Sequence, residues 1–141
     1  MSLPPRHTTV GLLFVLVILA GCGGGPSDTA VSGRLLENGE AVKPMQGMPP
    51  GDKGWQMTFT QADVKDPSSG SSYAQIADDG SFRVEGPNKK GLPPGKYRIS
   101  VEKGPKGKSA TIAITDLIEI PRAASVKVEV DAGTKTAKVT P

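Results

Sequence analysis

The chain has 141 residues and a formal net charge of +3 at pH 7, and it contains one histidine and one cysteine. Such a near-neutral charge excludes the strong basic stripe that nucleic-acid recognition requires, so we expect no nucleic-acid partner. A single cysteine excludes an internal disulfide, and one histidine with one cysteine is too few for an ordinary zinc site.

The first 21 residues are typical of a secretory signal peptide. Arg6 gives this segment a positive charge, and an apolar run extends from Val10 to Ala20. The run is shorter than the about 20 apolar residues that a membrane-spanning helix needs. We therefore predict that residues 1–21 direct export and are then cleaved from the protein.

The apolar run ends in Leu19-Ala20-Gly21-Cys22, which resembles the lipobox of bacterial lipoprotein precursors. The resemblance implies that Cys22 is alkylated by a diacylglyceryl group, that a peptidase cuts before it, and that its new amino group is acylated. Because each buried CH₂ contributes about 0.8 kcal/mol, two or three acyl chains would hold the protein stably at a membrane. The alternatives are an uncleaved anchor helix and a plain signal peptide followed by a stray cysteine. The expected location is the cell membrane or the outer membrane, with the domain facing the periplasm or the exterior.

Cleavage would remove His7 and would leave 16 basic and 14 acidic side chains. Without an imidazole or a free thiol, Ser-His-Asp and Cys-His catalysis are excluded. We therefore expect no enzyme activity, no catalytic residue, no metal site and no cofactor. The glycine-rich stretch 22–29 is predicted to be a flexible tether between the membrane and a single domain, residues 30–141.

Eight short runs alternate between apolar and polar residues, which predicts antiparallel strands with one buried face. The clear runs are 55–61, 81–86, 96–102 and 125–131, and the weaker ones are 30–36, 72–77, 110–114 and 136–140. Residues 117–120 form a further apolar run of ambiguous structure. Turn signals such as Asn38-Gly39 and Asp79-Gly80 separate the runs. The pattern predicts an all-β sandwich or barrel.

Several of these segments match one family in order. The matching residues are Val31, Ser32 and Gly33, the turn Asn38-Gly39, then Asp79, Gly80 and Phe82, and last Leu92, Pro94, Gly95 and Tyr97. In this order they resemble the carboxypeptidase regulatory-like domain. The resemblance implies a transthyretin-like, seven-stranded Greek-key β-sandwich, which has no catalysis of its own in metallocarboxypeptidases. Related transthyretin-like hydrolases rely on histidines and on a C-terminal Tyr-Arg-Gly-Ser, whereas this chain ends in Lys-Val-Thr-Pro.

Exposed aromatic side chains would form a stacking surface for sugars. Trp55 and Tyr97 fall on the apolar faces of their runs, so both are predicted to lie in the core. Tyr73 does not follow that pattern as clearly and is a candidate ligand contact.

Two loops are further candidates for a ligand or partner surface. The segment 43–54 carries Met45 and Met48 between prolines, and the segment 103–108 carries Lys103, Lys106 and Lys108. The methionines either form an exposed patch for a partner or belong to a loop that folds back over the sandwich. The lysines either meet anionic polymers or lipid headgroups, or they are simply solvated.

Carboxylates are the remaining candidates for chemistry. Asp78-Asp79-Gly80 supplies too few oxygens for calcium, which takes about six to eight ligands, and is predicted to be a turn. The leading hypothesis is a membrane-anchored envelope lipoprotein with a non-catalytic binding or structural role toward an unknown envelope protein or glycan. An alternative, a carbohydrate-binding accessory protein of the envelope, predicts a row of exposed aromatics on one sheet face. A hydrolase that uses a carboxylate pair such as Asp63 and Asp66 is a third hypothesis.

Overall fold

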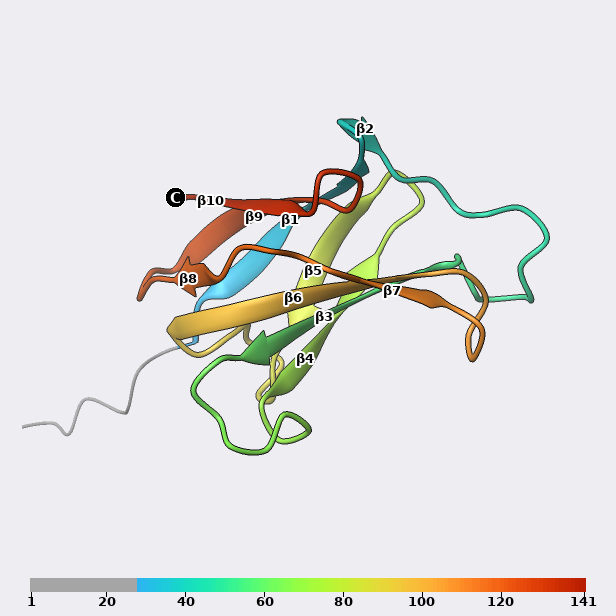
Figure 1. The fold of residues 1–141 in the computed structure, drawn as a ribbon. Helices are drawn as coiled ribbons and strands as arrows, with labels where there is room; N and C mark the ends of the chain where they lie inside the picture. The colour runs from blue at the N-terminus through green and yellow to red at the C-terminus, as the bar shows by residue number, and fades with distance from the viewer. Residues whose placement is uncertain (1–27) are drawn as a thin grey trace, which may run out of the picture.

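The computed structural model describes residues 28–141, which form ten β-strands (Figure 1). The strands are β1 (Ala30–Glu37), β2 (Glu40–Ala41), β3 (Trp55–Gln61), β4 (Ser71–Ile76), β5 (Ser81–Glu85), β6 (Gly95–Lys103), β7 (Ala110–Ala113), β8 (Ile118–Ile120), β9 (Ser125–Asp131) and β10 (Thr136–Thr140). In this part of the chain there is no helix long and apolar enough to cross a membrane. The predicted signal peptide, the lipobox with Cys22 and most of the predicted tether lie outside the described residues.

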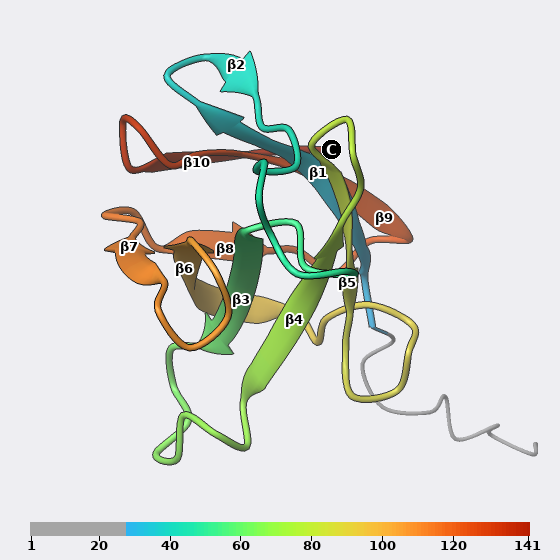
Figure 2. The ribbon, with the colours of Figure 1, turned by 90° about the vertical axis from the view of Figure 1, so that its right-hand side faces the viewer.

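The strands form one sheet that curls on itself. Its order is β10-β9-β1-β5-β4-β3-β6-β7, with β2 paired to β1 and β8 paired to β6. Strand β1 pairs in parallel with β9 on one side and antiparallel with β5 on the other. Strand β8, which is paired to β6, lies beside β10, so the sheet curls round a core and its two sides meet there (Figure 2). The all-β, sandwich-like fold predicted from the sequence is confirmed.

All eight predicted runs form strands, and their alternation separates a core face from a solvent face. In β3 the side chains of Trp55, Met57 and Phe59 are buried, whereas Gln56 is exposed. Tyr97 is buried as well, so the predicted core positions of Trp55 and Tyr97 are confirmed. The ambiguous run contains β8, whose Ile118 and Ile120 also enter the core.

A glycine in β1 allows a close approach between strands in the core. A Cβ atom at Gly33 would lie 1.7 Å from the carbonyl oxygen of Val128 and 2.8 Å from the ring of Phe82. The Phe82 ring also lies over Phe59, with 6.0 Å between the ring centroids. Gly33 therefore makes room for the aromatic pair at the centre of the sandwich.

The loops gather at two ends of the sandwich. The chain enters β1 at what we call the N-terminal end, formed by residues 28–29 and by the loops 62–70, 86–94 and 121–124. The opposite end is formed by the segments 38–39, 43–54, 77–80, 104–109 and 132–135. Figure 1 shows the 43–54 loop on the far side of the molecule from the start of β1.

Thr29 is fully buried at the N-terminal end and joins three segments. Its amide donates to the Leu92 carbonyl at 2.8 Å, and its carbonyl accepts from the Leu92 amide at 2.9 Å. Its hydroxyl donates to the Pro121 carbonyl at 2.7 Å and accepts from the Ala123 amide at 3.3 Å. The 86–94 loop can come this close because Gly91 has no side chain. A Cβ atom at this position would lie 2.0 Å from the Thr29 carbonyl oxygen and would clash with it.

Tyr97, at the start of β6, forms a second link at the N-terminal end. Its hydroxyl donates to the Pro93 carbonyl at 2.7 Å, the geometry known in β-sandwiches as a tyrosine corner. Burial, with a smaller contribution from the Asp28 carboxylate, raises the pKa of Tyr97 to about 12. The phenol therefore keeps its proton, and its hydrogen bond, well into the alkaline range.

Asp131 forms the corresponding link at the opposite end, between the β9–β10 turn and the β1–β2 turn. Its carboxylate accepts hydrogen bonds from four backbone amides, those of Asn38 at 3.0 Å, Gly39 at 2.7 Å, Gly133 at 2.9 Å and Thr134 at 3.1 Å. Burial acts to raise the pKa of Asp131, but the four amides outweigh it and hold this pKa below its ordinary value.

Candidate functional site

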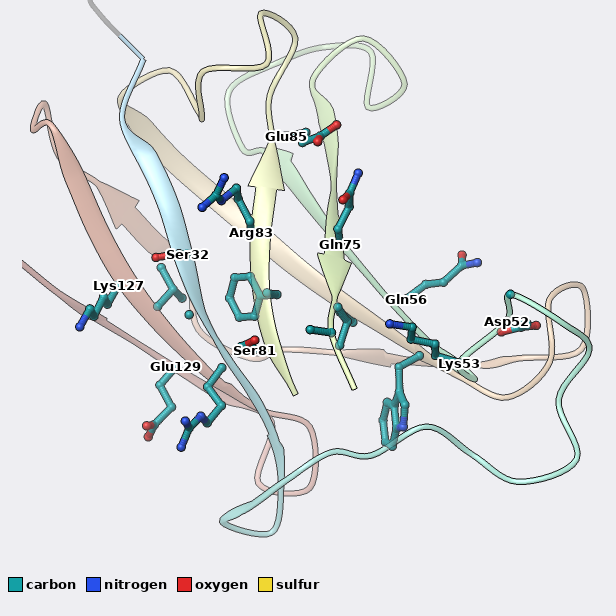
Figure 3. Close-up of a pocket in the computed structure, with 18 of the residues that line it drawn as sticks. Ser32, Asp52, Lys53, Gln56, Gln75, Ser81, Arg83, Glu85, Lys127 and Glu129 are labelled. Carbon is teal, nitrogen blue, oxygen red and sulfur yellow. The ribbon is translucent and has the colours of Figure 1, made fainter. Parts of the chain in front are cut away.

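The solvent-facing side of the sheet forms an open groove of about 1510 Å³ (Figure 3). Its floor is made by outward-pointing polar side chains of five neighbouring strands, from β9 through β1, β5 and β4 to β3. These side chains are Ser32, Arg34, Gln56, Gln75, Ser81, Arg83, Glu85, Lys127 and Glu129. They share one face because the residues that alternate with them, such as Val31 and Val84, are buried in the core.

The strand register places four of these side chains in one row. Ser32 is opposite Arg83 on one neighbouring strand and opposite Lys127 on the other, and Gln75 is opposite Arg83. Since adjacent strands lie about 4.8 Å apart, the row spans about 15 Å across the sheet. Figure 3 shows Ser32, Arg83 and Gln75 on three neighbouring strands. The row presents mostly hydrogen-bond donors to whatever enters the groove.

The groove carries more positive than negative charge. Five of the side chains that line it are cationic, and three are acidic. Within residues 28–141 the ion pairs join Lys53 to Asp78 and Lys103 to Glu37, so Arg83 and Lys127 have no ion-pair partner there. An exposed cation without such a partner remains available to a ligand's acceptor groups.

The 43–54 loop forms one wall of the groove and is tied to its neighbours. Asp52 accepts from the Gly54 amide at 2.8 Å and from the Lys106 amide at 3.0 Å, which connects this loop to the 104–109 loop. Lys53 forms an ion pair with Asp78 at 2.7 Å, which connects it to the β4–β5 turn. The two backbone hydrogen bonds hold the pKa of Asp52 below its ordinary value, so the carboxylate stays ionised at neutral pH.

Met45 follows the second of the two predicted alternatives, in which the loop folds back over the sandwich. The Met45 amide donates to the Lys53 carbonyl at 3.0 Å, and the Met45 side chain packs against the core. A Cβ atom at Gly54 would lie 2.6 Å from the Met45 sulfur, so the glycine is needed for this packing. Met48 is half-buried.

The three candidate lysines of the second loop differ in their surroundings. Lys103 is the last residue of β6, and its ammonium group pairs with Glu37 and lies 5.1 Å from the centre of the Trp55 ring. Lys106 and Lys108 are exposed, and Lys106 lines the groove. Lys103 is therefore part of a link between β1, β3 and β6 at the opposite end of the sandwich.

Tyr73 lies on the outward face of β4, where it is 66% exposed. It is opposite Glu85 in the register, and it lines a depression of about 220 Å³ that shares Gln75 and Glu85 with the groove. The other aromatic side chains in residues 28–141 are all buried: Trp55, Phe59, Phe82 and Tyr97. The described residues thus offer one aromatic platform beside the groove, and they do not form the row of exposed aromatics that the carbohydrate-binding alternative predicts.

Two of the candidate carboxylates, Asp66 and Asp79, accept hydrogen bonds within their own turns. Asp66 accepts from the Ser68 hydroxyl at 2.7 Å and from the Ser68 amide at 3.0 Å, and these bonds hold the pKa of Asp66 below its ordinary value. A general acid needs the opposite, a pKa raised toward neutrality. Asp79 accepts from Ser81 in the same way, and the predicted turn at 78–80 is confirmed. Within the described residues no three histidine, cysteine, aspartate or glutamate side chains are grouped so that they could hold a metal ion.

The residues that form the groove floor were not singled out by the sequence pattern. Alternation predicts that Arg83 and Lys127 point outward, but nothing local indicates that Ser32 lies between them. Comparison of this chain with protein-family models, with curated proteins and with solved structures found no match.

Proposed function

We propose that this protein is a lipid-anchored, non-catalytic binding module of the bacterial envelope. The observation that carries the binding role is the groove, whose floor of polar side chains crosses five strands and whose wall is tied to the sandwich by Asp52. The lipobox-like segment ending in Cys22 supplies the anchor. The absence of histidine after residue 7, and carboxylates that accept hydrogen bonds within their own turns, support a role without catalysis.

The proposal includes a domain of the carboxypeptidase regulatory-like, transthyretin-like type. Three of the matching positions have structural roles that support it. Gly33 makes room for Phe82, the Asn38-Gly39 turn donates to Asp131, and Tyr97 forms its corner with Pro93. These roles explain why a β-sandwich of this kind would keep such residues at these places.

Mass spectrometry of the membrane fraction tests the anchor. We expect the mature chain to begin at Cys22 and to carry diacylglyceryl and amide-linked acyl groups. The Cys22→Ala variant should be uncleaved or released in soluble form. A mature protein with an unmodified Cys22 would overturn the anchor.

Crosslinking of the anchored protein in intact envelopes tests the groove. We expect a crosslinked partner that is lost in Arg83→Ala and retained in the control Lys135→Ala, whose exposed side chain lies in the β9–β10 turn and does not line the groove. An unchanged crosslinking pattern in Arg83→Ala would show that the groove is not the binding face.

A carbohydrate-binding accessory protein is the second candidate, and the position of Tyr73 favours it. An exposed ring next to Gln75, Arg83 and Glu85 combines a stacking face with hydrogen-bond donors and acceptors, the groups with which proteins hold sugars. On a glycan array, Tyr73→Ala should weaken binding about tenfold, whereas the control Leu117→Ala, the other exposed large apolar residue within 28–141, should not. Equal binding by the two variants would count against this candidate.

A further inference from the structure

Two loops flank the point at which the chain enters the domain. The 86–94 loop is joined to Thr29 by two backbone hydrogen bonds of 2.8 and 2.9 Å. The 121–124 loop is joined to the Thr29 hydroxyl by bonds of 2.7 and 3.3 Å. In Figure 2 the 86–94 loop, drawn in yellow, lies beside the start of β1 and well apart from the 62–70 loop. Both flanking loops are therefore fixed to the first residues of the domain.

These flanking loops are basic. Lys89, Lys90 and Arg122 are exposed, and none of them forms an ion pair within residues 28–141. The one acidic side chain in residues 28–29, 86–94 and 121–124 is that of Asp28, which is half-buried and accepts a hydrogen bond from Asn88 at 3.3 Å. The chain thus enters the domain through a surface that carries three unpaired cations.

The proposed anchor would bring this surface close to a bilayer. Cys22 lies six positions before Asp28, and six residues of fully extended chain span at most about 20 Å. Basic side chains are attracted to an anionic bilayer once they come within a Debye length, about 8 Å at physiological ionic strength. Each lysine or arginine so placed favours contact by about fivefold.

We propose that Lys89, Lys90 and Arg122 contact anionic phospholipid headgroups and so orient the anchored domain on the membrane. This inference rests on the proposed lipid anchor at Cys22. The 86–94 and 121–124 loops then face the bilayer, and the 43–54 loop, which walls the groove at the opposite end, is directed away from it. The domain would present its groove to partners in the envelope while its base rests on the headgroups.

The single tryptophan of the chain reports this orientation. Trp55 lies at the opposite end of the sandwich, and strands of eight or nine residues separate the two ends by about 25 Å. The lipidated protein is placed in vesicles of anionic phospholipid that contain a dansyl-labelled lipid headgroup, and energy transfer from Trp55 to dansyl is measured. The test variant is Lys89→Glu with Lys90→Glu. The control is Lys108→Glu with Lys135→Glu, which changes charge equally at two exposed positions of the opposite end.

We expect low transfer in the native protein and in the control, and a clear increase in the test variant. The loss of two lysines alone weakens the orienting preference by about 25-fold, and the anionic headgroups also repel the two glutamates that replace them. The difference should vanish in zwitterionic vesicles and at about 1 M salt, where the Debye length falls to about 3 Å. Circular dichroism checks that each variant is folded, and a second variant, Lys90→Glu with Arg122→Glu, should behave as the first. Unchanged transfer in both folded, lipidated variants would overturn the orientation and leave the binding module standing. A protein without the lipid mass would overturn the anchor, and the orientation with it.

Discussion

The two ends of the sandwich are held together by different chemistry. At the N-terminal end the neutral hydroxyls of Thr29 and Tyr97 donate to backbone carbonyls. At the opposite end the carboxylates of Asp131 and Asp52 accept from backbone amides. Acid removes the charge of a carboxylate, and alkali removes the proton of a phenol. We therefore expect acid to weaken the opposite end and alkali to weaken the N-terminal end. The substitutions below test that contrast, beginning with the largest expected loss of stability.

The N-terminal end depends first on a close backbone approach. A Cβ atom at Gly86 would lie 1.5 Å from the carbonyl oxygen of Gly91, so Gly86→Ala must push apart the loop that is bonded to Thr29. We expect the free energy of unfolding to fall by about 3 kcal/mol in urea denaturation. The control Gly70→Ala, whose nearest neighbour would be a Val64 methyl at 3.1 Å, should lose far less. Equal losses would show that the approach of Gly86 to Gly91 is not what holds this end.

The next prediction concerns the buried hydroxyl at the N-terminal end. Thr29→Val keeps the shape of the side chain but leaves the Pro121 carbonyl and the Ala123 amide without a partner. We expect the free energy of unfolding, measured by urea denaturation, to fall by about 2 kcal/mol. The loss should be the same at pH 3 and at pH 7, because no ionisable group is removed. Thr111→Val, at an exposed position of β7, is the control. If the stability lost in Thr29→Val differed between pH 3 and pH 7, the contrast between the two ends would not hold.

The opposite end should respond to acid through Asp131. Asp131→Asn turns one accepting oxygen into a donor that faces a backbone amide, and we expect a loss of about 1.5 kcal/mol at pH 7. Because the pKa of Asp131 is lowered by folding, its stabilisation is present above the unfolded pKa of about 3.9 and is lost as pH falls through the folded pKa. Native protein should therefore lose more stability than the variant between pH 7 and pH 2. Asp63→Asn, at an exposed position, serves as the control. The contrast between the ends fails if the free energy of unfolding depends on pH in the same way in Asp131→Asn and in Asp63→Asn.

The smallest expected effect lies at the N-terminal end and concerns alkali. Tyr97→Phe removes the hydrogen bond to Pro93 and should cost about 1 kcal/mol at pH 7. The pKa of Tyr97 is raised by folding to about 12, so the stabilisation is present below the unfolded pKa of about 10 and is lost as pH rises through about 12. Urea denaturation at pH 7 and pH 11 should show a steeper loss in native protein than in Tyr97→Phe. Tyr73→Phe, at an exposed position, should follow the native curve.

The strands were predictable because their alternation is local. A run such as 125–131 shows its buried and solvent faces within seven residues, and each of the eight runs became a strand. The predicted core places of Trp55 and Tyr97 followed from the same pattern. Glycine-containing turns, such as the one at 77–80, were predictable for the same reason.

The candidate site was not predictable because it depends on which strands are neighbours. The Ser32–Lys127 register joins positions far apart in the chain, and no local pattern indicates it. The same holds for Asp131, whose bonds to Asn38 and Gly39 join two turns that are far apart in the chain. The ion pair of Lys103 with Glu37 and its place over Trp55 likewise depend on segments far apart in the chain.

The parallel pairing of β1 with β9 also bears on how the domain folds. The first strand of the described domain lies inside the sheet, and one of its edges stays without a partner until residues 125–131 are available. Pairings between such distant segments raise contact order and slow folding. A chain that stops short of β9 would leave an open strand edge, the feature on which aggregation nucleates. Folding of this domain is therefore expected to wait for nearly the whole polypeptide, a property compatible with passage across a membrane in the unfolded state.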